Sequence, residues 1–169
     1  YDRKDPPQIK AIASWIDTHC ADGEIAYMIP HDTLYCPDHF KNCQLPATPI
    51  NNKLAFGFSV PGTHYFPMQF FEAKYVLTAD PFPLTHVNDP ENEMSHKLND
   101  MFLAVRDEYF ALEETFDMGN GTTFTIWRRT VAPSRAEVEY YLSAFTEEDA
   151  KYPEMFSQVA ENWLAARGL

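Results

Sequence analysis

The sequence predicts an α/β domain with a three-layer, mostly parallel sheet, an antiparallel edge hairpin, and helices on both faces. Three observations lead to this class. Amphipathic stripes alternate along the chain with short apolar runs, which is the pattern of helices alternating with strands. The apolar run at residues 74–79 has the composition of a buried central strand. The Asn120-Gly121 pair, followed by alternating apolar and polar residues, predicts a hairpin.

The first third of the chain predicts one helix and one strand, followed by a segment that is hard to assign. The Asp-Pro-Pro sequence at residues 5–7 is a helix-start signal. The apolar residues that then fall on one helical face are Ile9, Ile12, Ala13 and Ile16. Asp22-Gly23 is expected to end this helix, and residues 24–29 are expected to form a short buried strand. Residues 31–63 are rich in Pro, Asn, Asp and Cys, which favours short pieces joined by loops.

The middle of the chain predicts a short helix, the central strand and a long helix. Residues 65–73 favour the short helix, and the apolar run at 74–79 ends in Asp80-Pro81. An amphipathic stripe then predicts a helix that ends near residue 109. The apolar members of the stripe are Met94, Leu98, Met101, Phe102, Val105 and Tyr109.

The last third predicts the hairpin and two closing helices. Strands near 112–118 and 122–129 flank the Asn120-Gly121 turn. The Ser-x-x-Glu sequence at residues 134–137 has the spacing of a capping box at a helix start. A last helix is expected to begin near Pro153.

Length and composition predict one soluble domain that spans residues 1–169. Hydrophobic residues make up 45% and charged residues 22% of the chain, which suffices for a buried core. The formal net charge of −12 makes nucleic acid and anionic lipid headgroups poor partners. Without an apolar run of about 18 residues, this stretch is not expected to span a bilayer. Because the sequence opens on Tyr1 without Met, we expect it to be excised from a larger membrane protein.

No complete catalytic motif is recognisable in the sequence, so we assign no catalytic residue and no cofactor. A dinucleotide loop, a phosphate-cradling loop and a His-Glu-x-x-His motif are all missing. The main candidate for ligand binding is Asp80, because ligands in open α/β sheets bind beyond the carboxyl ends of strands. His64 and His86 lie in Pro-rich segments beside the predicted strand ends and complete this candidate site. The alternative is that Asp80 forms a turn into Pro81.

A second polar cluster combines histidine with cysteine. His31, Cys36, His39 and Cys43 offer the ligand types of a structural zinc ion, but their spacing matches no known zinc family, so no metal is assigned. A disulfide between Cys36 and Cys43 is an alternative if the domain lies outside the cytoplasm. Ordinary polar loop residues are the third interpretation. Cysteine connectivity does not follow from sequence, so the three interpretations stay open.

Four segments carry a resemblance to a known family. They are Glu72–Pro81, the Asn-Gly hairpin tip, the strand Phe124–Arg129 and the Tyr152-Pro153 step. In this order they resemble the soluble domain after the last transmembrane helix of bacterial protein-O-mannosyltransferase-like membrane glycosyltransferases. The segment from His31 to Cys43 has no counterpart in that pattern.

The resemblance implies a location and partners. It implies a soluble domain on the extracytoplasmic face of the cell membrane, attached to the transmembrane part of its own parent chain. A glycan or a lipid-linked sugar is then the expected ligand, since such enzymes use lipid-phosphate sugar donors. Their catalytic carboxylate lies between transmembrane helices, so the domain itself is expected to be accessory and non-catalytic. A free-standing small-molecule enzyme or binding module with a site near Asp80, His64 and His86 is the alternative.

Overall fold

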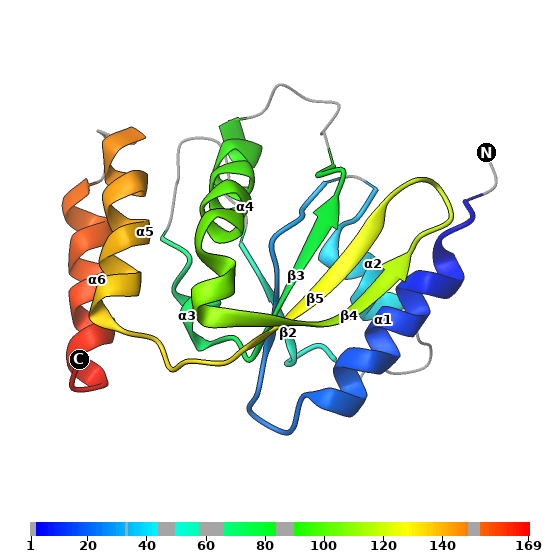
Figure 1. Cartoon of the computed structure of the whole chain (residues 1–169), viewed down its shortest axis with the longest axis horizontal. Helices are drawn as coiled ribbons and strands as arrows, with labels where there is room; N and C mark the ends of the chain where they lie inside the picture. The colour runs from blue at the N-terminus through cyan, green and yellow to red at the C-terminus, as the bar shows by residue number, and fades with distance from the viewer. Residues whose placement is uncertain (1–2, 33, 44–49, 58–65, 84–89, 149–152) are drawn as a thin grey trace.

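The computed structural model shows an α/β fold (Figure 1), and the described residues are 3–32, 34–43, 50–57, 66–83, 90–148 and 153–169. These residues form six helices and five strands. The helices are α1 (Pro6–His19), α2 (Pro37–Asn42), α3 (Met68–Glu72), α4 (Pro90–Tyr109), α5 (Arg135–Glu148) and α6 (Pro153–Ala166). The strands are β1 (Ala26–Met28), β2 (Leu54–Phe56), β3 (Tyr75–Asp80), β4 (Phe110–Asp117) and β5 (Thr123–Arg129).

The strands of the described residues form one mixed sheet in the order β2-β1-β3-β5-β4. β1 pairs in parallel with β2 and β3, whereas β5 pairs antiparallel with β3 and β4. β3 is therefore the strand at which a parallel half of the sheet joins an antiparallel half. A register shift between Leu112 and Glu114 places a bulge in the edge strand β4.

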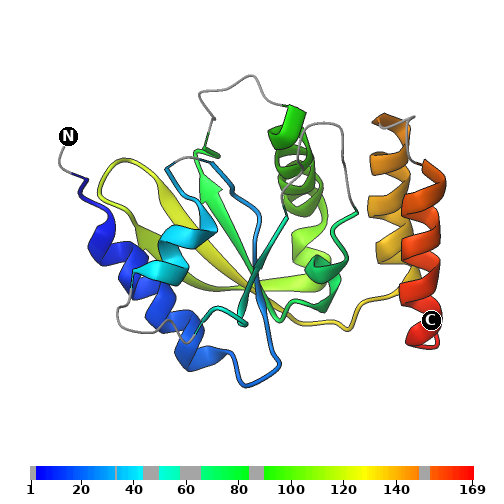
Figure 2. The same cartoon turned by 180° about the vertical axis from the view of Figure 1, so that it is seen from behind.

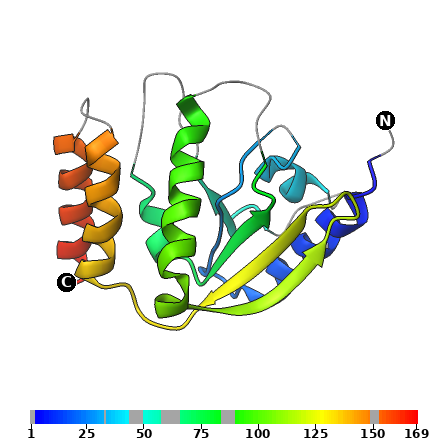
Figure 3. The same cartoon turned by 45° about the horizontal axis from the view of Figure 1, so that its top comes forward.

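Helices pack on both faces of the sheet because successive strand residues point to opposite sides. Along β3, Tyr75 and Leu77 join a hydrophobic cluster with α1, whereas Val76 joins the cluster that contains α4. α1 and α2 cover the face that is toward the viewer in Figure 2, and α3 and α4 lie on the other face. α5 and α6 lie side by side beyond α4, which stands between them and the sheet (Figures 1 and 3).

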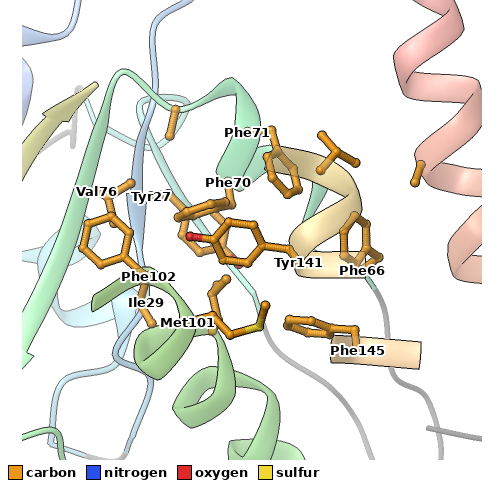
Figure 4. Close-up of a cluster of buried hydrophobic side chains, with 14 of the residues drawn as sticks. Tyr27, Ile29, Phe66, Phe70, Phe71, Val76, Met101, Phe102, Tyr141 and Phe145 are labelled. Atoms are coloured by element: carbon orange, nitrogen blue, oxygen red, sulfur yellow. The ribbon is translucent and has the colours of Figure 1, made fainter. Parts of the chain in front are cut away.

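An aromatic cluster attaches the α5–α6 pair to the rest of the molecule (Figure 4). The ring of Tyr141 on α5 lies 5.1 Å from that of Phe70 on α3, and Phe145 lies 5.6 Å from Phe66. Trp163 on α6 lies 6.0 Å from Phe71. Aromatic side chains bury large apolar areas, so this cluster is expected to dominate the attachment.

The predicted fold class is confirmed, and its finer description is confirmed in part. The sheet is parallel in only half of its pairings, because the hairpin strand β5 pairs with the central strand β3 itself. The predicted strands and helices are found within a few residues of their expected bounds. Residues 31–63, which were hard to assign, contribute the short elements α2 and β2. None of the helices in the described part of the chain combines the length and the apolar character that crossing a bilayer requires.

Two local predictions need correction. The hairpin loop is longer than the predicted two-residue turn, because Met118 N–H donates to the Thr122 carbonyl and leaves three residues, 119–121, between them. The predicted capping box is half formed. The Ser134 hydroxyl accepts from the Glu137 N–H at 3.2 Å, but the Glu137 carboxylate turns away to bind Arg129.

Candidate functional site at the carboxyl edge of the parallel strands

The carboxyl ends of β1, β2 and β3 meet at one edge of the sheet because these strands run parallel. After β1 the chain continues to α2 on the α1 side of the sheet, and after the neighbouring strand β3 it continues to α4 on the opposite side. Such a reversal is a topological switch point, the place where ligands bind in open α/β sheets. The candidate site therefore lies where β1 and β3 end.

Local sequence explains why the strands end at this edge. The Ile29 N–H donates to the Leu77 carbonyl at 3.1 Å, which is the last ladder bond between the β1 and β3 segments. Pro81 has no N–H, so it cannot donate a further bond from β3 toward β1. Pro30 likewise cannot donate a bond from the end of β1 toward β2. The side chains that follow are thereby released from the sheet to face solvent or a ligand.

Asp80 and His31 both lie near this edge, at the ends of neighbouring strands. The last pair between β1 and β3 is Met28 with Leu77, and each of the two polar residues follows three positions after its member of that pair. Asp80 is the last residue of β3 and is exposed. The sequence analysis predicted Asp80 as the main candidate. The strand pairing adds His31, which the sequence analysis had placed among possible metal ligands.

His31 is half-buried and keeps a neutral imidazole at neutral pH. Its ring lies 5.6 Å from that of Phe56, the last residue of β2. Burial lowers the pKa of His31, although Asp32 and Asp38 favour the charged form. A neutral imidazole donates one hydrogen bond and accepts another, which suits a ligand hydroxyl.

Aromatic and cationic groups complete the edge. The Lys41 ammonium on α2 lies 4.9 Å from the centroid of the Phe56 ring. Phe82, two residues beyond Asp80, lies 4.5 Å from the His96 ring on α4. The strand ends at this edge thus carry a carboxylate, a neutral imidazole and aromatic side chains, which are groups that contact polyhydroxyl ligands. Sequence reasoning missed Phe56 and Lys41, because they lie in elements too short to show a period.

The other candidates for the ligand site, His64 and His86, lie outside the described residues. The structure therefore adds nothing to the prediction made for them.

The His/Cys cluster is separated by α2. Cys36 precedes this helix and Cys43 follows it, so their Cα atoms stand about 10 Å apart along its axis. A disulfide needs less than about 7 Å. Accordingly, Cys20, Cys36 and Cys43 are all free thiols. Cys43 donates to the Phe40 carbonyl at 3.0 Å.

The positions of the side chains do not support the zinc interpretation either. The His39 Nδ1 lies 3.1 Å from the Leu34 carbonyl, while His31 packs on Phe56. Within the described ranges, no three His, Cys, Asp or Glu side chains gather in a way that could hold a metal ion.

Comparison with known proteins gives no relative. No family model matches the chain, and neither a curated protein nor a solved structure matches it. Function is therefore argued from the residues themselves.

Proposed function

We propose that the chain is an accessory, non-catalytic extracytoplasmic domain of a membrane glycosyltransferase that uses a lipid-phosphate sugar donor. In this proposal it is a three-layer α/β domain whose carboxyl-edge site binds the glycan or another hydroxyl-rich acceptor. The observation that carries the proposal is the position of Asp80. The most extended segment of the family resemblance, Glu72–Pro81, ends at the switch point of the sheet.

The other segments of the resemblance support the same proposal, because each coincides with an element of the fold. Phe124–Arg129 falls within β5, and the Asn-Gly pair lies in the loop between β4 and β5. Pro153, the second residue of the Tyr-Pro step, is the first residue of α6. A resemblance that follows element boundaries is less easily explained by chance than one scattered across them.

The chemistry at the edge favours binding over catalysis. Asp80 accepts hydrogen bonds, the neutral His31 ring both donates and accepts, and Phe56 supplies an apolar wall. These are the groups that orient a sugar, and we assign none of them to bond making. We therefore expect the isolated chain to transfer no sugar from lipid-phosphate or nucleotide donors.

The proposal is tested by titrating the chain with neutral oligosaccharides and following backbone amide shifts by NMR. We expect saturable shifts around Asp80, His31 and Phe56. Asp80→Asn should weaken the affinity by at least about tenfold, because a hydrogen bond to a charged group contributes about 1.5–3 kcal/mol. Asp100→Asn changes another exposed aspartate, on α4, and is the matched control. Shifts that avoid this edge, or an equal loss in both variants, would refute the acceptor site.

The membrane part of the proposal has its own test in the parent reading frame. Many apolar stretches upstream of Tyr1 are expected if the chain belongs to a polytopic enzyme. Their absence would favour the second candidate, a free-standing small-molecule enzyme or binding module at the same switch point. Turnover of a small substrate that is lost in Asp80→Asn would identify that second candidate as an enzyme.

A further inference from the structure

We propose a second ligand site, for a phosphate-class oxyanion, in a groove at the opposite, amino edge of the sheet. The groove has a volume of about 760 Å³, within the range of small-molecule sites. Its walls come from the segment before β3, the end of β5, the segment that enters α5, and the end of α6. This inference is independent of the acceptor site, since none of the carboxyl-edge residues lines the groove.

Three cationic side chains meet in this groove. Lys74 precedes β3, Arg129 ends β5, and Arg167 follows α6. Glu72 has the only acidic side chain among the described lining residues. The chain as a whole carries −12 with just 13 Lys and Arg residues. Each of the three cations already has a carboxylate partner, since Lys74 pairs with Glu24, Arg129 with Glu137 and Arg167 with Glu72. Selection of an anion would therefore rest on the hydrogen-bond donors that line the groove, not on a net positive charge.

The heads of two of these cations are accessible. The Lys74 and Arg167 side chains are 37% and 40% exposed. Lys74 pairs with Glu24 at 2.7 Å, and Arg167 pairs with Glu72 and stacks over the Trp163 ring. Surface ion pairs contribute little free energy, so an incoming oxyanion can share these donors at small cost.

Arg129 supplies the observation that sets this groove apart from a solvated charged surface. Its side chain is only 8% exposed, and its Nη1 donates to both Glu137 oxygens at 2.9 and 3.0 Å. Its Nη2 is buried and has no hydrogen-bond partner among the described residues. A buried guanidinium nitrogen without an acceptor costs free energy, and an oxyanion in the groove that Arg129 lines would offset that cost.

The ligand class follows from these donors. Guanidinium and ammonium groups around one groove suit a tetrahedral phosphate, which offers several acceptor oxygens. Such a group could belong to a free phosphate ester or to a lipid headgroup. The net charge of −12 repels an anionic membrane, so we expect the free ester.

Isothermal titration calorimetry of the whole chain with inorganic pyrophosphate tests the site. We expect saturable one-to-one binding, weakened about tenfold by Lys74→Gln and by Arg167→Gln. Arg128→Gln is the matched control, because Arg128 is 43% exposed, has the partner Glu113, and does not line the groove. An absence of saturable binding, or an equal loss in Arg128→Gln, overturns the proposal.

A variant that binds more tightly tests the site in a way that unfolding of the variant cannot imitate. Glu72→Gln removes the groove's carboxylate but keeps an oxygen that can accept from the Trp163 indole N–H. We expect this variant to bind pyrophosphate about threefold more tightly, since one repulsive charge is gone. An unchanged or weaker affinity in a folded Glu72→Gln protein contradicts the proposal.

Vesicle sedimentation distinguishes the two sources of phosphate. Vesicles of phosphatidylcholine with and without phosphatidic acid are compared with free pyrophosphate. Pyrophosphate binding without sedimentation supports a free ester. Sedimentation that requires phosphatidic acid and is lost in Lys74→Gln supports a headgroup. If the chain neither binds pyrophosphate nor sediments with the vesicles, the site is refuted for both sources.

Discussion

Arg129 and Glu137 form a salt bridge that is almost fully removed from solvent, with side-chain exposures of 8% and 0%. Arg129 also lies over the Phe110 ring at 4.5 Å. The pair links β5 to the first turn of α5 and is therefore part of the joint between the sheet and the α5–α6 pair. Breaking such a pair is costly because it leaves one buried charge without its partner.

We predict that Glu137→Ala lowers the free energy of unfolding by about 3–5 kcal/mol. The double variant Arg129→Met with Glu137→Leu should recover most of that loss, because neither charge then remains buried. Urea unfolding of the three proteins measures both effects. A Glu137→Ala midpoint equal to that of the unmodified chain would show that water reaches the pair.

His31 gives the protein a pH dependence of known sign. Burial depresses its pKa below the ordinary value of 6.5. The contribution of His31 to stability is therefore complete above about pH 6.5 and is lost as the pH falls through the lower folded-state pKa. Protonation must place a charge on a ring that packs against Phe56.

We predict that acidification from about pH 7.5 to about pH 5 destabilises the unmodified chain more than His31→Gln. Urea midpoints at the two pH values give the comparison. His39→Gln changes an exposed histidine on α2 and should behave like the unmodified chain. If the urea midpoint falls equally in His31→Gln and in the unmodified chain, this pH dependence does not come from His31.

At the scale of elements, the β4–β5 loop depends on glycine at both of its ends. Gly119 and Gly121 have φ values of +72° and +89°, where other residues are strained. Between them, Asn120 donates from Nδ2 to the Tyr35 hydroxyl at 2.7 Å and accepts from the Thr122 N–H. The loop is thus fixed both by its backbone and by a contact with a distant segment.

We predict that Gly121→Ala lowers the free energy of unfolding by about 1–2 kcal/mol through backbone strain alone. An added Cβ at this position meets no atom within 4 Å, so steric overlap does not contribute. Ala132→Ser, in an exposed segment without positive φ, is the control. Thermal or urea unfolding is sufficient, and equal midpoints for Gly121→Ala and the control would contradict the prediction.

Elements with a complete period could be predicted from the sequence, and shorter ones could not. The stripe from Leu98 to Tyr109 extends over about three turns and indicates α4 clearly. α2 has six residues and β2 has three, which is too few for a helical or strand period to show. The antiparallel pairing of β5 with β3 was also beyond reach, because register between distant segments depends on tertiary packing.

On the scale of the whole molecule, the α5–α6 pair closes the aromatic cluster that rests on α3 and α4. We predict that a chain ending at Thr130 loses cooperative unfolding and binds the dye ANS, because Phe66, Phe70 and Phe71 would face water. Val159→Ser, an exposed site on α6, is the control and should change neither property. A sharp unfolding transition in the truncated chain would show that the sheet layer is self-sufficient.

The candidate site was only partly visible in the sequence. Asp80 was found because it directly follows a recognisable strand and precedes Pro81. His31 was grouped with the cysteines, because only the pairing of β1 with β3 places the ends of these two strands side by side. The groove at the amino edge left no local signal, since Lys74, Arg129 and Arg167 come from three distant parts of the chain.

The junction at β3 also bears on how the chain reaches its native state. The β4–β5 hairpin joins neighbouring segments and needs only a three-residue loop, so it can form within microseconds. β1 must instead meet β3 across a long intervening stretch, and the chain entropy of closing that loop is lost before the contacts form. We therefore expect pulse-labelling hydrogen exchange during refolding to protect the amides of β5 before those of β1. On this route the hairpin acts as a template, and the nascent protein exposes the unpaired edge of β3 until the parallel strands arrive.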